Sequence, residues 1–171
     1  MTALVLVGLM GTGKTTIGRI VAERTGRPFV DSDEAIEQRT GKTVRELWEQ
    51  GGEAAYRQLE SDVLLDAVAR GTDVVAAAAG VVLDPVVRTA LRSALVVWLR
   101  AQPSTLAGRV SPHDHRPLLG DHPLPVFEAQ ATERAPLYAE VADATIDVDT
   151  IDPEQAAETV VDLFHRSTAD G

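Results

Sequence analysis

The feature that most restricts the fold of this 171-residue chain is a glycine-rich stretch of eight residues near its N-terminus. Gly8-Leu9-Met10-Gly11-Thr12-Gly13-Lys14-Thr15 matches the pattern G-x-x-x-x-G-K-[ST] at every position. It directly follows the apolar run Ala3–Val7 and leads into Lys14–Arg24, whose apolar residues recur at helical spacing. A strand, a tight loop and a helix in this order predict the first unit of an α/β fold.

Each residue type in this loop has a physical reason if the ligand is a chain of phosphates. Glycines let the backbone wrap closely and turn its N–H groups inward, and the start of the following helix adds a positive end. Lys14 can reach the β- and γ-phosphates, and the Thr15 hydroxyl can ligate Mg²⁺. The alternative is a glycine-rich turn without a ligand, which the complete match in its strand–loop–helix context disfavours. The predicted nucleotide contacts are Gly11, Thr12, Gly13, Lys14, Thr15 and Thr16.

Strand-like and helix-like segments alternate along the rest of the chain. The predicted strands are 3–7, 28–30, 74–79, 94–99 and 145–148, and the predicted helices include 14–24, 34–39, 44–49, 53–70 and 85–91. A last helix is predicted to begin at Pro153, with Asp152 as its N-cap and Gln155 completing a capping box. This alternation predicts one α/β domain over residues 1–171, with a five-stranded parallel sheet and helices on both faces.

One stretch, Ser111–Pro125, resists assignment to a helix or strand. It contains four prolines and three of the four histidines of the chain. A loop of this length in a compact domain is typical of a lid or a disordered segment, and we predict a lid at about residues 111–125. His113, Asp114 and His115 could also ligate a divalent ion, but a solvated loop is the favoured interpretation.

Composition excludes several classes of protein. The net charge of −10 argues against general nucleic-acid binding, which depends on neutralising phosphates. The absence of cysteine excludes disulfides and cysteine-ligated metals. No apolar run approaches the ~20 residues of a membrane span, and the start of the chain lacks the charged leader of a signal peptide. We therefore expect a cytoplasmic monomer that acts on a small molecule, without nucleic-acid or membrane partners.

Two carboxylates, Asp31 and Asp33, come directly after the second predicted strand. Ligands of open α/β sheets bind at this carboxyl edge. Beside bound phosphates, one carboxylate can hold Mg²⁺ through water and the other can accept a proton from an attacking hydroxyl. The alternative is a pair of N-capping residues for the next helix. The nearby phosphate loop favours the functional interpretation.

Further motifs follow in order through nearly the whole chain, and together with the phosphate loop they resemble shikimate kinase. They are Asp31-Ser32-Asp33-Glu34, Arg39-Thr40-Gly41, Gly51-Gly52-Glu53 with Tyr56-Arg57 and Glu60, Arg116-Pro117-Leu118-Leu119, and Arg134-Ala135-Pro136-Leu137-Tyr138. The resemblance implies the three-layer P-loop NTPase fold and Mg²⁺-dependent phosphoryl transfer from ATP to a hydroxyl of shikimate, giving shikimate 3-phosphate and ADP. It places the acceptor-binding segment at about residues 31–61.

The resemblance also implies a role for individual residues. Asp33 would bind the acceptor and take up the proton, and Asp31 would support the Mg²⁺ shell together with Thr15. A second group would surround the ligands: Arg57 and Arg134 on the acceptor carboxylate, Glu60 orienting Arg57, Gly80 at the acceptor ring, Arg116 in the lid on the moving phosphoryl group, and Arg109 and Pro153 on the two faces of adenine. Guanidinium groups suit these tasks because their forked donors match carboxylate and phosphate oxygens.

One part of the family pattern is altered. Where shikimate kinases carry three glycines after the third strand, this chain has Ala78-Ala79-Gly80. Added methyl groups could displace a bound ring, and alanine resists the positive φ that glycine adopts freely. Three alternatives therefore stay open: shikimate is still the acceptor, another small hydroxylated acid such as gluconate has replaced it, or the protein binds a nucleotide without catalysis. A nucleoside monophosphate is a weaker candidate, because the Arg57/Arg134 pair suits a single carboxylate.

Overall fold

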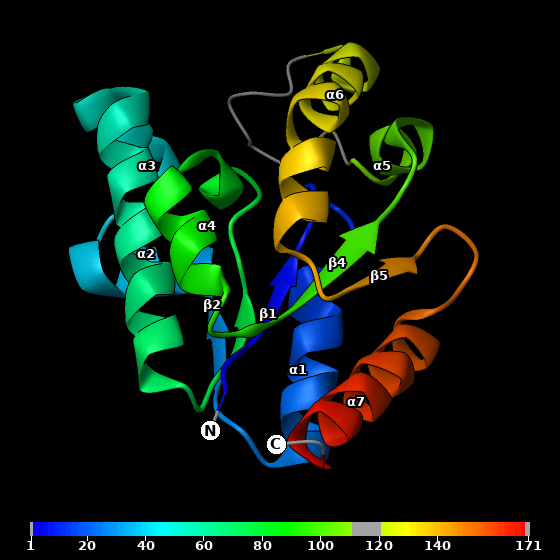
Figure 1. The fold of residues 1–171 in the computed structure, drawn as a ribbon. Coiled ribbons are helices and arrows are strands. Elements are labelled where there is room, and N and C mark those ends of the chain that lie inside the picture. The colour runs from blue at the N-terminus through cyan, green and yellow to red at the C-terminus, as the bar shows by residue number, and fades with distance from the viewer. Residues whose placement is uncertain (1, 111–120, 170–171) are drawn as a thin grey trace.

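The computed structural model describes residues 2–110 and 121–169 and shows a parallel sheet between two layers of helices (Figure 1). The strands are β1 (Leu4–Val7), β2 (Phe29–Asp31), β3 (Val74–Ala76), β4 (Leu95–Arg100) and β5 (Ala144–Asp147). Their order across the sheet is β2-β3-β1-β4-β5, and every neighbouring pair is parallel. The predicted α/β fold with a five-stranded parallel sheet is therefore confirmed.

The helices cover both faces of the sheet. They are α1 (Lys14–Thr25), α2 (Ser32–Thr40), α3 (Val44–Arg70), the 3₁₀ helix η1 (Val81–Leu83), α4 (Pro85–Leu91), α5 (Pro103–Arg109), α6 (Pro123–Val141) and α7 (Pro153–Ala169). In Figure 1, α1 and α7 lie side by side at the lower right, and α3 and α4 lie together at the left. Within the described residues, this arrangement gives the three layers that the alternating pattern predicts.

The central strand β1 explains why the layers hold together. Its side chains alternate between the faces: Leu4 and Leu6 pack with α1 and α7, whereas Val5 and Val7 pack with α3, α4, α5 and α6. All four are at most 1% exposed. Each such burial contributes about 1.5–3 kcal/mol, so the strand that leads into the phosphate loop is anchored from both sides.

Two predicted helix boundaries are confirmed by their geometry. At the start of α7, the Asp152 N–H donates to Gln155 Oε1 (3.1 Å) and the Gln155 N–H donates to Asp152 Oδ1 (2.9 Å), which is a capping box. Within α3, Gly52 has φ 73° and ψ −176°, so the segments before and after it are two helices joined by a kink. The kink changes the direction of the chain just before the residues that enter the candidate site.

Two predicted boundaries are wrong. The third strand ends at Ala76 rather than Ala79, because alanine has little strand preference and the chain turns at Ala78 into η1. The loop predicted over Ser111–Pro125 extends too far, because Pro123–Pro125 form the first turn of α6. Proline is favoured there, since the first N–H groups of a helix need no partner within it.

Some predictions fall on residues 111–120, outside the described part of the chain. They concern Arg116, the His113-Asp114-His115 cluster and most of the predicted lid. Among the described residues, no helix combines the length and apolar character needed to cross a membrane.

Candidate active site

A cavity of about 720 Å³ opens at the carboxyl ends of β1, β2 and β3. Its walls come from the phosphate loop, the start of α2, both halves of α3, segment 76–80 and the face of α6 that carries Gln130 and Arg134. The predicted site residues that line it include Lys14, Thr15, Asp31, Asp33, Arg57 and Arg134. The sheet therefore gathers side chains that lie up to 120 positions apart in sequence into one concave site, as expected at this edge.

The phosphate loop is a closed turn whose shape requires glycine. Gly8 has φ +146°, and a Cβ on it would lie 2.4 Å from the carbonyl oxygen of Leu99. Gly13, with φ +93°, is the N-cap of α1. Lys14 Nζ donates to the carbonyl oxygens of Gly8 (2.8 Å) and Leu9 (2.9 Å), so its ammonium lies over the loop.

Thr12 stabilises the loop from within. Its side chain is buried, and its hydroxyl donates to the Leu9 carbonyl oxygen at 3.0 Å. The Thr12 N–H points to the same oxygen at 3.4 Å. The geometry therefore gives Thr12 a role in the shape of the loop, whereas Gly11, Gly13, Lys14, Thr15 and Thr16 line the cavity.

Asp31 serves two purposes with its two carboxylate oxygens. Oδ1 accepts the N–H groups of Asp33 (3.0 Å) and Glu34 (3.2 Å) and thereby caps α2. Oδ2 accepts the Thr15 hydroxyl at 2.5 Å. Asp31 can therefore cap α2 and support a bound Mg²⁺ at the same time. A hydroxyl and a carboxylate oxygen brought together beside a phosphate loop are the hard oxygen donors that suit Mg²⁺.

Asp33 faces the cavity from the first turn of α2 and is held by a buried tyrosine. The Tyr56 hydroxyl donates to Asp33 Oδ1 at 3.0 Å. Tyr56 is 5% exposed, and its ring lies 5.7 Å from that of Trp48. Burial, together with the charge of Asp33, raises the pKa of Tyr56, so the phenol stays a neutral donor. The carboxylate is thus fixed toward the space next to the phosphate loop.

Arg57 is held by a carboxylate from its own helix. Its Nη1 donates to Glu60 Oε2 at 2.8 Å, and its Nη2 lies 3.5 Å from Glu53 Oε1. Glu60 is 3% exposed. Burial raises the pKa of the Glu60 carboxyl, and the guanidinium of Arg57 opposes that rise. Glu60 is therefore placed to orient the guanidinium of Arg57.

Arg134 lies on α6, on another wall of the same cavity. It is 6% exposed, and its Nε has no hydrogen-bond acceptor among the described residues. On the same helix, the Tyr138 hydroxyl donates to the Ala79 carbonyl oxygen at 2.5 Å. Two half-buried or buried guanidinium groups, Arg57 and Arg134, therefore line a single cavity. Such a pair suits one small planar anion.

Segment 76–80 accommodates its alanines without backbone strain. No residue other than glycine has a positive φ in the described chain, and Gly80 itself has φ −87° and ψ −5°. Ala78 and Ala79 therefore occupy conformations open to any residue. The backbone at these two positions therefore does not require glycine.

Arg109 and Pro153 do not themselves line the cavity. Arg109, at the end of α5, donates to the carbonyl oxygens of Gly11 (2.9 Å) and Val148 (3.3 Å). Val148 begins the loop that leads to Pro153 at the start of α7. Arg109 thus joins the phosphate loop to the chain before α7, which is a position beside the loop rather than inside the cavity.

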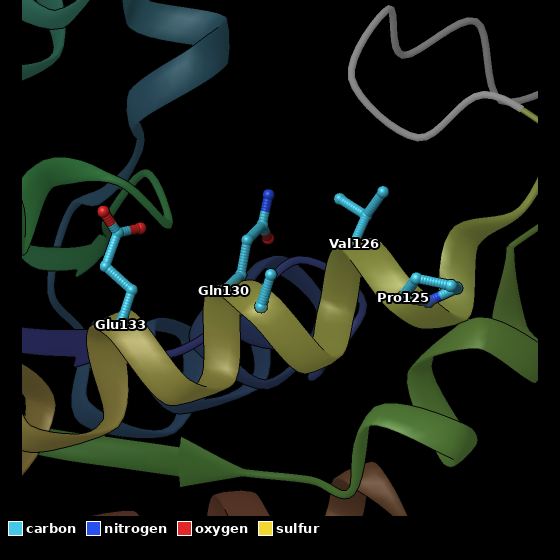
Figure 2. A pocket seen from close by; sticks show the side chains of 5 residues that line it. Pro125, Val126, Gln130 and Glu133 are labelled. Atoms are coloured by element: carbon cyan, nitrogen blue, oxygen red, sulfur yellow. The ribbon is translucent and has the colours of Figure 1, made fainter.

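Some residues of the site could not be predicted from the sequence. Tyr138 was visible in the Arg134–Tyr138 motif, where a spacing of four on a helix brings the two side chains together, but no role was assigned to it. Gln130 belongs to none of the sequence motifs and could not be predicted from them. Figure 2 shows that Gln130 projects from α6, which also carries Val126 and Glu133. These residues line a shallow hollow of about 530 Å³ that shares Gln130 with the main cavity.

The Glu60 carboxyl gives the first testable prediction. Because its pKa is raised above the ordinary 4.5, the folded protein holds this proton more tightly than the unfolded chain does. That stabilisation is complete below the ordinary pKa and is lost as the pH rises through the raised value. The free energy of unfolding of the parent protein should therefore fall, relative to that of Glu60→Gln, as the pH rises above about 4.5.

Denaturant unfolding of both proteins across a pH series measures this difference. Glu49→Gln, at an exposed position of the same helix, controls for the loss of one negative charge. A difference between the parent and Glu60→Gln that stays constant or grows with pH would contradict the direction of the shift.

Comparison with known proteins identifies the family of this chain. The family model described as shikimate kinase matches residues 10–165. A shikimate kinase of Gloeobacter violaceus is 45% identical over 172 residues, covering 98% of this chain and 96% of its own length. One of Symbiobacterium thermophilum is 44% identical over 150 residues, covering 85% and 86%.

A solved structure is similar over nearly the whole fold. The shikimate kinase of Acinetobacter baumannii in complex with shikimate matches with a TM-score of 0.92 at 34% identity, covering 98% of this chain and 94% of its own. The matched length, the identities and the common fold agree with the motifs that surround the cavity. The chain belongs to the shikimate kinase family.

Proposed function

We propose that this protein transfers the γ-phosphoryl group of ATP to a hydroxyl of shikimate, giving shikimate 3-phosphate and ADP. The observation that carries the proposal is one cavity that joins a phosphate loop, a carboxylate and two inward-facing arginines: Lys14, Asp33, Arg57 and Arg134. A phosphorylated donor and a carboxylate-bearing acceptor with a free hydroxyl match these groups. Membership of the family supports the same assignment.

The loop residues would bind the phosphates of ATP. Backbone N–H groups at the start of α1 would cradle the phosphates, and the Lys14 ammonium would leave the carbonyl oxygens of Gly8 and Leu9 to reach the β- and γ-phosphates. Thr15 and Asp31 would hold Mg²⁺, which when bound neutralises developing charge on the phosphates. Arg109 and Pro153 would enclose the adenine, and Arg116 would contribute a further positive charge to the moving group.

The acceptor would lie between α3, α6 and segment 76–80. Arg57 and Arg134 would hold its carboxylate, and this anchors one end of the ring. Asp33 would accept the proton of the attacking hydroxyl while that oxygen bonds to the γ-phosphorus. The bond from the γ-phosphorus to the β–γ bridging oxygen breaks, and ADP leaves.

An acceptor panel tests the proposal directly. ADP release would be followed in a coupled assay with Mg·ATP and millimolar shikimate, gluconate or no acceptor. We expect turnover that depends on shikimate, disappears when a chelator removes Mg²⁺ and returns when Mg²⁺ is added. ATP binding without turnover on any acceptor would favour a non-catalytic protein, and turnover on gluconate alone would favour an altered acceptor.

Four further predictions concern the acceptor-binding segment, the lid, the oligomeric state and the location of the protein. Acceptor binding by about residues 31–61, a lid at about residues 111–125, a monomeric state and a cytoplasmic location stay predictions. Size-exclusion chromatography with light scattering would measure the oligomeric state.

A further inference from the structure

The side chain of Arg57 lies directly against the backbone of Gly80. A Cβ built on Gly80 would stand 2.0 Å from Nη1, 2.6 Å from Cζ and 3.1 Å from Nη2 of Arg57. No side chain can be accommodated at these distances unless the guanidinium moves. The absence of a side chain at this position is therefore what gives the guanidinium its space.

The backbone conformation of Gly80 does not itself require glycine. Its φ of −87° and ψ of −5° lie in a region that other residues adopt. Ala78 and Ala79 stand next to it in the same segment, also without positive φ, and both line the cavity. The requirement for glycine at residue 80 is thus steric and comes from Arg57.

Arg57 cannot easily move to another position. Glu60 Oε2 holds Nη1 at 2.8 Å, and Glu60 is itself 3% exposed. The Trp48 ring centroid lies 5.9 Å from Arg57 Cζ. A guanidinium displaced from Gly80 would leave Glu60 as a buried carboxylate without this partner, which is costly. The pairing with Glu60 therefore opposes displacement of the guanidinium from this place.

We propose that Gly80 is a positioning residue that acts through Arg57. Its missing side chain leaves the space that places the guanidinium fork at the acceptor carboxylate. This inference rests on the proposed function, since it assigns Gly80 to the recognition of the acceptor acid. It also separates Gly80 from Ala78 and Ala79, whose methyl groups this arrangement tolerates.

Gly80→Ala tests the proposal through kinetics. Displacing the guanidinium by about an ångström should raise KM for shikimate on the order of 10²-fold and leave KM for ATP within about twofold. Gly108→Ala is the matched control, because a Cβ there meets no atom within 4 Å. It adds the same methyl group and should leave KM for shikimate unchanged. An unchanged KM in Gly80→Ala overturns the proposal.

Two further readouts separate action through Arg57 from a direct contact of Gly80 with the ring. With the methyl ester of shikimate, which lacks the carboxylate charge, the penalty of Gly80→Ala should largely disappear. In the Arg57→Ala background, Gly80→Ala should add little to the loss already present. An equal penalty on the ester, or penalties that multiply in the double variant, would assign Gly80 a role independent of Arg57.

A crystal structure of Gly80→Ala keeps this inference distinct from the proposed function. If the parent protein shows no turnover with shikimate, the proposed function fails, but the position of the guanidinium can still be observed. We expect it to be displaced from residue 80 and its bond to Glu60 to be altered. A guanidinium in its original place overturns the inference. If the variant does not fold, recovery of folding in Arg57→Ala/Gly80→Ala supports it, and a double variant that also fails to fold contradicts it.

Discussion

Lys14→Ala is expected to lower kcat on the order of 10³-fold. The ammonium is the loop's only side-chain cation, and charge on the transferred phosphoryl group must be stabilised during the reaction. Such stabilisation acts mainly on the transition state, so kcat should fall much more than the affinity for shikimate. Steady-state kinetics with Mg·ATP and shikimate measure both.

The contacts of Lys14 require a control for the shape of the loop. Because Nζ also binds the carbonyl oxygens of Gly8 and Leu9, its removal could deform the turn instead of removing a catalytic charge. Lys14→Met keeps most of the stem, and Lys42→Ala removes the other lysine of the chain at an exposed position. We expect Lys14→Met to lose kcat like Lys14→Ala, and Lys42→Ala to keep it. Near-normal turnover in Lys14→Met would show that the ammonium does not act on the phosphates.

Local sequence predicted the parts of the structure that depend on local physics. The loop from Gly8 to Thr15 and the cap of α7 at Asp152 each need particular residue types at short spacing, and the structure contains both. The parallel sheet followed from the order of apolar runs, because a strand that returns parallel needs a crossover. The motifs also indicated that Asp33, Arg57 and Arg134 would meet, and all three line one cavity.

Contacts between distant segments could not be predicted in the same way. The hydrogen bond from Tyr138 to Ala79 joins residues 59 positions apart, and the packing of Gly80 on Arg57 depends on where α3 passes η1. The start of α6 was hidden for another reason. Prolines that usually mark a loop stand in the first turn of this helix, where they are tolerated. Contacts between segments far apart in sequence, such as the two above, cannot be predicted from local spacing or residue preference.

Asp33→Asn is expected to lower kcat about 10²- to 10⁴-fold, the range of a lost general base. The amide oxygen can still accept the Tyr56 hydroxyl, which lies 3.0 Å from Oδ1, so the side chain should keep its place. What the substitution removes is the ability to take up the proton of the attacking hydroxyl. Binding of ATP should therefore be unchanged, because Asp33 faces the acceptor side of the cavity.

Two further variants distinguish a general base at residue 33 from a residue that only contributes negative charge. Asp66→Asn removes the same charge from an exposed position of α3, where the carboxylate pairs with Arg39, and should leave kcat within about twofold. Tyr56→Phe leaves the Asp33 carboxylate present but removes its hydroxyl donor, so it should reduce kcat far less than Asp33→Asn does. If Asp33→Asn kept kcat within tenfold of the parent, or if Tyr56→Phe were equally damaging, proton uptake would not be the function of Asp33. The carboxylate would then act through the position of its neighbours, and another group would have to accept the proton.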